Sequence, residues 1–367
     1  MLFHKCGPGC VPRAAADSLG GGGASSPRRR SYTVDLHCHV MVPQVEKLVA
    51  DRPEKLAEPQ MQLRAMGAPS VEHNQKHMLP AAVPKMLDLQ LRLADMDRMG
   101  VDLQLISPSP PQYYYWADAD LATSVVRLQN EHIAKVCEAH ADRLAGLGNI
   151  ALQHPDLAVE QLTHAVRELG LKGVEVSTSV NGLELSDPQF ERVWACAAEL
   201  GCLVFIHPFG TSLGERVNRY YLQNMIGQPL ETTIALSSLI FSGVLDRHPK
   251  LRLLAAHGGG YLPYYIGRSN HGHHVRPEAQ QAQLAPVEYL KKIWFDSLVY
   301  EPQILKQLID TVGVGQVVVG TDYPFDMGHY DMHSLLEAVP GLSGADRERI
   351  LSGNALDLLG LKRPATA

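Results

Sequence analysis

Eight short apolar runs, separated by segments with helical periodicity, constrain the fold of this chain more than any other feature. The runs cover residues 34–36, 101–106, 144–150, 173–176, 203–206, 251–255, 293–295 and 317–319. Each run has the length and the apolar character of a buried parallel strand. Eight strands that alternate with helices favour a closed (β/α)8 barrel over an open doubly wound sheet.

The segments between these runs carry the expected helical patterns. Met86, Leu89, Leu93 and Met96 repeat with a period of 3.6 residues and predict one core-facing helical stripe. Similar patterns cover residues 119–142, 156–169, 187–200, 231–246, 302–312 and 344–359. An open sheet usually has a Gly-rich turn after its first strand, but no glycine occurs in residues 35–39. We therefore predict an α/β fold, a (β/α)8 TIM barrel with an insertion after the first strand. The insertion, residues 40–85, could cover the barrel mouth.

The composition of residues 1–30 differs from that of the rest. Four consecutive glycines followed by alanine and serines are typical of a flexible linker, and three arginines follow at residues 28–30. This segment has no apolar core of a secretory signal. We expect residues 1–30 to form a disordered N-terminal arm and residues 31–363 to form the barrel.

Charge and cysteine usage exclude several classes of partner. The formal net charge is −6, so the chain lacks the basic footprint of a nucleic-acid-binding protein. No apolar run is long enough to span a membrane. The six cysteines are scattered through the chain and do not form a disulfide framework. We therefore expect a cytoplasmic protein that binds neither nucleic acid nor membrane.

Metal-competent side chains follow several of the predicted strands. His37 and His39 end the first strand, His207 ends the fifth, His257 ends the sixth and Asp322 ends the eighth. In a (β/α)8 barrel the carboxyl ends of all strands open onto one face, where active sites are built. Each residue alone has a structural explanation, such as a turn former or a helix cap. Those explanations do not account for their common position at one end of the barrel.

The residue types at this end suit a transition metal. His37 and His39 point to the same side of an extended strand, because side chains alternate with a period of two. Imidazole nitrogen and carboxylate oxygen are ligands for Zn²⁺ and similar ions, and a catalytic site leaves one position open. We predict that His37, His39, His207 and Asp322 bind one divalent ion, Zn²⁺ in the first instance and Mn²⁺ as the alternative.

These motifs make the chain similar to the amidohydrolase superfamily, and within it to the branch of aminocarboxymuconate semialdehyde decarboxylase. The matching stretches are Val34–His39, Phe205–Pro208, Ala256–Gly260, Gly267–Gly272 and Gly320–Phe325. The similarity covers about residues 33–361 and leaves out the predicted arm.

The resemblance implies roles for individual residues. The four predicted ligands would hold the ion together with a water, and His257 would be the nearby acid/base that activates this water, with Asp322 as a second catalytic residue. The resemblance leaves two routes open: addition of hydroxide to the substrate, or binding of the substrate carboxylate by the metal with protonation of the adjacent carbon. Arg268 would bind a substrate carboxylate across the interface of a homodimer. The implied activity is non-oxidative decarboxylation of a small unsaturated or aromatic carboxylic acid. A metal-dependent hydrolase or hydratase of a related dicarboxylate or lactone is the alternative.

One departure from the branch concerns substrate binding. The position of a second substrate-binding arginine corresponds to Val83, with Lys85 close by. Arg64, His77 or Lys85 could replace that arginine. The sequence therefore leaves open whether the substrate is that of the branch.

Overall fold

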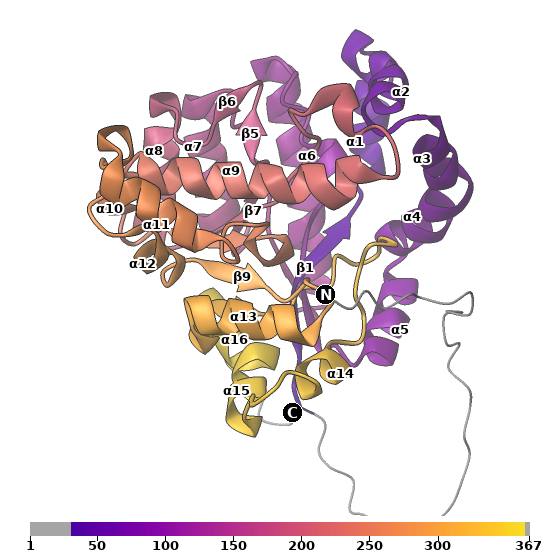
Figure 1. Ribbon diagram of the computed structural model, residues 1–367. Coiled ribbons are helices and arrows are strands. Elements are labelled where there is room, and N and C mark those ends of the chain that lie inside the picture. Colours follow the sequence, from indigo (N-terminus) through magenta and orange to yellow (C-terminus); the bar gives the residue numbers. More distant parts are fainter. Residues whose placement is uncertain (1–30, 364–367) are drawn as a thin grey trace, which may run out of the picture. The chain divides into compact units, whose positions relative to one another are not determined.

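The computed structural model describes residues 31–363, and the predicted N-terminal arm lies outside this range. All eight predicted strands are present: β1 Val34–Val40, β2 Leu103–Pro108, β3 Leu144–Gly146, β4 Gly173–Val176, β7 Leu203–Ile206, β8 Arg252–Ala255, β9 Trp294–Asp296 and β10 Val317–Val318. Figure 1 labels β1, β7 and β9 among them. A short hairpin of β5, Ser179–Val180, and β6, Leu183–Glu184, was not predicted. Its two strands pair with each other, outside the two larger sheets.

The eight main strands close into a parallel barrel. Hydrogen-bonded ladders run in the order β1-β2-β3 and β10-β9-β8-β7-β4. Single parallel bridges join β3 to β4 through Gly148 and Val174, and β1 to the β10 segment through Asp35 and Val319. The ring is therefore complete, and the predicted (β/α)8 barrel is confirmed.

The interior of the barrel is filled by side chains from alternate positions of the strands. Val34 and Leu36 of β1 lie in one fully buried cluster with Phe205 of β7, Leu254 of β8 and Val318 of β10. Such a packed interior is a core rather than a pore. It fixes the direction in which each strand leaves the barrel.

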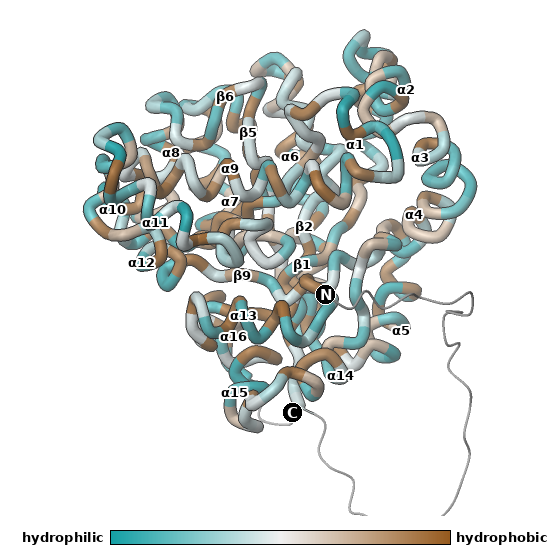
Figure 2. Tube along the Cα trace, in the orientation of Figure 1, coloured by the Kyte–Doolittle hydropathy of each residue, from teal (hydrophilic) through white to brown (hydrophobic). Residues whose placement is uncertain are grey.

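Helices surround the strands. They are α5 Leu89–Met99, α6 Ala119–Ala139, α7 Pro155–Arg167, α8 Glu191–Leu200, α9 Gln228–Phe241, α10 Val244–Arg247, α11 Ile266–Val275, α12 Pro286–Leu290, α13 Pro302–Val312, α14 Met332–Glu337, α15 Gly344–Glu348 and α16 Asn354–Leu359. Hydrophilic and hydrophobic stretches alternate along these helices (Figure 2), as amphipathic helices require. Within residues 31–363, every helix is too short or too polar to serve as a transmembrane span.

The insertion after β1 is helical. It contains α1 Pro43–Val49, α2 Pro53–Met66, α3 Ala68–His73, the π-helix η1 Asn74–Met78 and α4 Leu79–Leu87. The predicted single stripe from Met86 to Met96 is wrong in one respect, because α4 ends before Asp88 and α5 begins after it. The Asp88 carboxylate caps α5 by accepting hydrogen bonds from the backbone of Gln90 and Leu91.

Candidate metal centre

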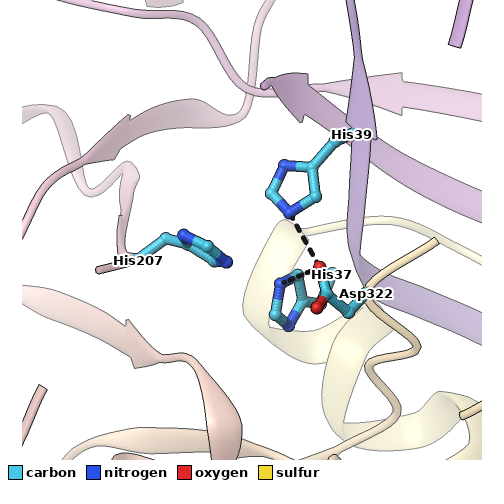
Figure 3. Close-up of side chains that lie close together, drawn as sticks. All are labelled: His37, His39, His207 and Asp322. Carbon is cyan, nitrogen blue, oxygen red and sulfur yellow. Dashed lines mark ion pairs between the residues drawn. The ribbon is translucent and has the colours of Figure 1, made fainter. Parts of the chain in front are cut away.

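The four predicted ligands meet at the carboxyl end of the barrel. His37 and His39 lie on β1, His207 directly follows β7, and Asp322 follows β10. One ligand atom from each of these residues lies within 4.8 Å of the others. Figure 3 shows the two β1 histidines and Asp322 in contact, with the His207 ring facing them. The sequence therefore located a cluster with the composition and the size of a single-ion site.

The donor atoms of this cluster are buried and lack other partners. His37 Nε2 lies 3.4 Å and His39 Nε2 3.3 Å from Asp322 Oδ1. These three atoms and both ring nitrogens of His207 are buried without a hydrogen bond. Buried polar atoms are nearly always satisfied in native proteins. A divalent ion would bind one of these atoms from each residue, including one of the two His207 nitrogens, and three imidazoles with one carboxylate are a suitable donor set.

The charges and the burial of the cluster favour binding of a cation. Burial, with the charges of His39 and His37, holds the pKa of His207 well below its usual value, so this ring is neutral. Burial would raise the pKa of Asp322, but the charge of His37 and the proximity of His257 and His39 hold it well below its usual value. Burial opposes the protonation of His37, yet Asp322 and Asp296 raise its pKa to about 10. The site therefore favours positive charge beside Asp322.

A buried aspartate that sequence reasoning missed supports the cluster. Asp296 ends β9, and its Oδ2 lies 2.7 Å from His37 Nδ1. The same carboxylate accepts hydrogen bonds from the backbone of His257 at 2.9 Å and of Gly258 at 2.8 Å. Burial raises its pKa, but the hydrogen bond and the charge of His37 lower it below the usual value, so Asp296 is ionised. Asp296 therefore orients His37 through the nitrogen that faces away from the cluster.

The signal for Asp296 was present in the sequence. It is a polar residue at the carboxyl end of the run at residues 293–295, the position that identified the other site residues. A second missed residue, Glu175, is a charged residue within the buried strand β4. Its Oε2 lies 3.7 Å from His39 Nδ1, and Tyr113 donates a hydrogen bond to its other oxygen. Both histidines of β1 thus have a buried carboxylate behind them.

His257 stands beside the cluster, as predicted. Its Nε2 lies 3.9 Å from Asp322 Oδ2, and its ring centroid lies 5.1 Å from that of His207. The side chain is 14% exposed, whereas those of His37 and His39 are fully buried. It is therefore the histidine of this group that an incoming molecule can reach most easily.

The backbone at His257 and Asp322 is strained. Their φ angles are +55° and +58°, in the left-handed region that non-glycine residues rarely occupy. Such conformations persist where the surrounding structure enforces them, often at functional sites. Here the hydrogen bonds from the His257 segment to Asp296 and from the Asp322 amide to the His37 carbonyl enforce them.

The remaining predicted substrate residues lie outside the cluster. Arg268 is exposed on α11. Lys85 Nζ lies 3.2 Å from the nearly buried Asp95 carboxylate, so this lysine already has a counter-ion. Arg64 is exposed on α2, and the ring of His77 lies 5.2 Å from that of His73. The structure therefore brings the metal and acid/base candidates together, but none of the candidates for substrate-carboxylate binding.

Comparisons with known proteins agree with this geometry. The family model described as Amidohydrolase matches residues 34–361. The chain is 38% identical to the 2-amino-3-carboxymuconate-6-semialdehyde decarboxylase of Dictyostelium discoideum, over 75% of this chain and 77% of the relative.

Solved structures share the barrel. The 5-carboxyvanillate decarboxylase of Sphingomonas paucimobilis has a TM-score of 0.78 at 24% identity, and the match covers 90% of this chain and 99% of the other. The 5-carboxyvanillate decarboxylase of Novosphingobium aromaticivorans, solved with bound manganese and 3-methoxy-4-hydroxy-5-nitrobenzoic acid, has a TM-score of 0.79 at 21% identity, covering 94% and 100% of the two chains. At these identities the likeness establishes a common fold.

Proposed function

The chain belongs to the amidohydrolase family, and from that premise we propose that it is a metal-dependent, non-oxidative decarboxylase, a carboxy-lyase. Its substrate is a small unsaturated or aromatic carboxylic acid similar to aminocarboxymuconate semialdehyde. The observation that carries this proposal is the buried cluster of three histidines and one aspartate with His257 beside it. The 38% identity to a decarboxylase favours carboxy-lyase chemistry over the hydrolysis that the family description implies.

The proposed ligands of the ion are His37, His39, His207 and Asp322. Three imidazole nitrogens and one carboxylate oxygen favour Zn²⁺, and Mn²⁺ is the alternative, as in the structure of the Novosphingobium enzyme. The ion would supply a Lewis acid that polarises an oxygen of the substrate. Asp296 holds the His37 ring in the orientation that ligation needs, with its Nε2 toward the cluster.

The chain's own acid/base group completes the reaction. When CO₂ leaves, the carbon–carbon bond breaks and its electron pair stays on the substrate carbon, which must then take up a proton. His257 is placed to hold that proton, because its Nε2 faces Asp322 and its ring is the most accessible of the group. Asp322 lies between His257 and the β1 histidines, so the same carboxylate would orient both the ligands and the proton donor.

We further propose a cytoplasmic homodimer in which Arg268 contributes to the partner's site. Arg268 and the 68% exposed Tyr265 lie together at the start of α11, which supports an interface at this position. The cysteines at positions 38, 137, 196 and 202 are free thiols, which supports a reducing compartment. Light scattering from the purified chain tests the dimer.

The decarboxylation itself is tested with a panel of unsaturated and aromatic carboxylic acids. Metal-loaded protein is incubated with each acid, and CO₂ release and product mass are measured together. We expect at least one acid to lose CO₂ in amounts equal to the product formed. Uptake of water without CO₂ from the same panel would contradict the proposal and favour the hydrolase or hydratase.

A further inference from the structure

A cavity of about 760 Å³ lies where the insertion meets two loops of the barrel. Its wall comes from residues 67–70, 73 and 74 of the insertion, residues 218–221 after β7, and Asp326 with Met327 after β10. These three segments follow β1, β7 and β10, the strands that carry the proposed metal ligands. Loops after the carboxyl ends of barrel strands form the mouth, so the cavity belongs to the same face as the metal centre.

The wall of this cavity is rich in hydrogen-bond donors. Arg219 lines it, and within residues 31–363 no carboxylate pairs with its guanidinium. The hydroxyl of Ser70 and the side-chain amide of Asn218 also have no protein hydrogen-bond partner in that range. The one acidic residue of the wall, Asp326, has its Oδ2 3.4 Å from His73 Nε2. A ligand with negatively charged acceptor oxygens fits this set of groups.

The loop that carries Arg219 has an unusual backbone. Tyr220 and Tyr221 follow it with φ angles of +57° and +61°, two consecutive left-handed residues without a glycine. Tyr220 is 81% exposed, although aromatic side chains are usually buried. The carbonyl of Asn218 approaches Gly67 so closely that a Cβ there would lie 2.1 Å away. The loop is thus held against the insertion in a strained form, which is typical of functional sites.

The segment that carries Asp326 connects this wall to the metal centre. Asp326 lines the cavity and lies four residues after the proposed ligand Asp322. The backbone of Phe325 donates a hydrogen bond to the Asp322 carbonyl at 3.0 Å, and the Phe325 ring centroid lies 5.5 Å from that of His39. One short turn therefore joins the cavity wall to the metal cluster.

We propose that this cavity binds a second carboxylate of the substrate, remote from the one that is removed, with Arg219 as its counter-ion. The inference rests on the proposed function and identifies Arg219 as the residue that selects dicarboxylic over monocarboxylic acids. None of the earlier candidates for this role, Arg64, His77 and Lys85, lines the cavity. The insertion and the loop after β7 would then determine which substrates bind, while the residues on the barrel strands determine the reaction.

The test compares binding of diacids and a monoacid by titration calorimetry on the metal-loaded full chain. The probes are isophthalate, terephthalate and benzoate. The variants are Arg219→Ala and Arg219→Lys. Arg216→Ala serves as the matched control, because Arg216 is also exposed on the same loop but does not line the cavity. Thermal midpoints of all variants check that the fold is intact.

Wild-type protein should bind at least one diacid more tightly than benzoate. Arg219→Ala should weaken diacid binding about tenfold and leave benzoate binding unchanged, as expected for loss of one charge-assisted contact. Arg219→Lys should recover part of the loss, and Arg216→Ala should behave as wild type. No preference for diacids in the wild type, or equal losses in Arg219→Ala and Arg216→Ala, would overturn the proposal. Because binding is measured without turnover, a failure of decarboxylation is recognised separately by the absence of CO₂.

Discussion

The metal centre and the insertion share one face of the barrel but are built in opposite ways. His37 and His39 are fully buried on a strand, and a carboxylate lies behind each ring. The insertion helices α2 and α3 bury no residue, and Leu56 and Met61 on α2 are 67% and 63% exposed. The reactive groups are therefore fixed by the core, whereas the surface around them rests on few buried contacts. Chemistry and specificity can then vary independently.

The largest effect is expected from the proposed ligands. Asp322→Asn should leave the protein folded but reduce bound metal from about one ion per chain to near zero, and turnover should fall with it. Metal content is measured by mass spectrometry after dialysis. Asp310→Asn is the control, because it removes an exposed carboxylate on α13 that belongs neither to the cluster nor to the cavity wall. Full metal content in Asp322→Asn would show that the cluster is not the metal site.

Substitution of His257 distinguishes a role in proton transfer from a role in metal binding. His257→Asn should keep the ion, because no proposed ligand is lost, and should lower kcat about 10²–10⁴-fold, the usual share of general acid–base catalysis. His164→Asn on the exposed face of α7 provides the control and should match the wild type. Loss of the ion in His257→Asn would make His257 a ligand. Unchanged turnover would assign the proton to another group.

Substitution of Asp296 tests whether the buried carboxylate bonded to a ligand histidine contributes to metal affinity. Asp296→Asn removes the negative charge from the partner of His37 and should weaken metal binding about 10–100-fold, the usual effect of such a change. Equilibrium dialysis against a metal buffer measures the affinity. Asp310→Asn on α13, an exposed carboxylate paired with Lys306, should leave it unchanged. Equal affinities for all three proteins would mean that β1 alone positions His37.

Glu46 connects the insertion to the barrel through hydrogen bonds, and its substitution is expected to have the smallest effect of these variants. This α1 carboxylate accepts hydrogen bonds from Gln112 and Tyr114, and Lys55 lies 3.0 Å away. Burial raises its pKa, but these partners lower it below the ordinary value of 4.5. Because the pKa of Glu46 is lowered in the folded state, its ionised form stabilises the protein at pH values above the ordinary pKa. This stabilisation is lost as the pH falls through the pKa of the folded state.

Glu46→Gln should therefore reduce the free energy of unfolding by about 1 kcal/mol at pH 7, and the difference from wild type should shrink below pH 4. Denaturant unfolding at a series of pH values measures it. Glu54→Gln, on the exposed start of α2, should show no such dependence. A deficit in Glu46→Gln that does not change with pH would indicate lost packing rather than lost charge.

The sequence predicted the barrel well because buried parallel strands carry a strong local signal. Every one of the eight runs became a strand, and the residues at their carboxyl ends met as expected. Helical periodicity gave a wrong prediction at Asp88, where a side-chain hydrogen bond starts a new helix. Asp88 interrupts a continuous apolar stripe because its carboxylate caps a new helix, and periodicity does not report caps.

The insertion and the second layer of the site were harder to predict. Residues 53–73 have little amphipathic pattern, since α2 and α3 bury nothing, so neither these two helices nor the cavity beside them was expected. Arg219 lies in no recognisable sequence motif. Its proposed role in carboxylate binding follows only from the way three segments distant in sequence form the cavity. Asp296 had a positional signal at the end of a predicted strand. It was missed because an aspartate alone does not indicate a partner for His37.

The most direct test of the central claim is a metal titration followed by CO₂ release. The chain is stripped of metal, supplied with increasing Zn²⁺ or Mn²⁺, and assayed with the acid identified from the panel. The four-residue site predicts that CO₂ release rises in proportion to bound metal and stops at about one ion per chain. Full activity of the metal-free chain, or a requirement for a second ion, would contradict it.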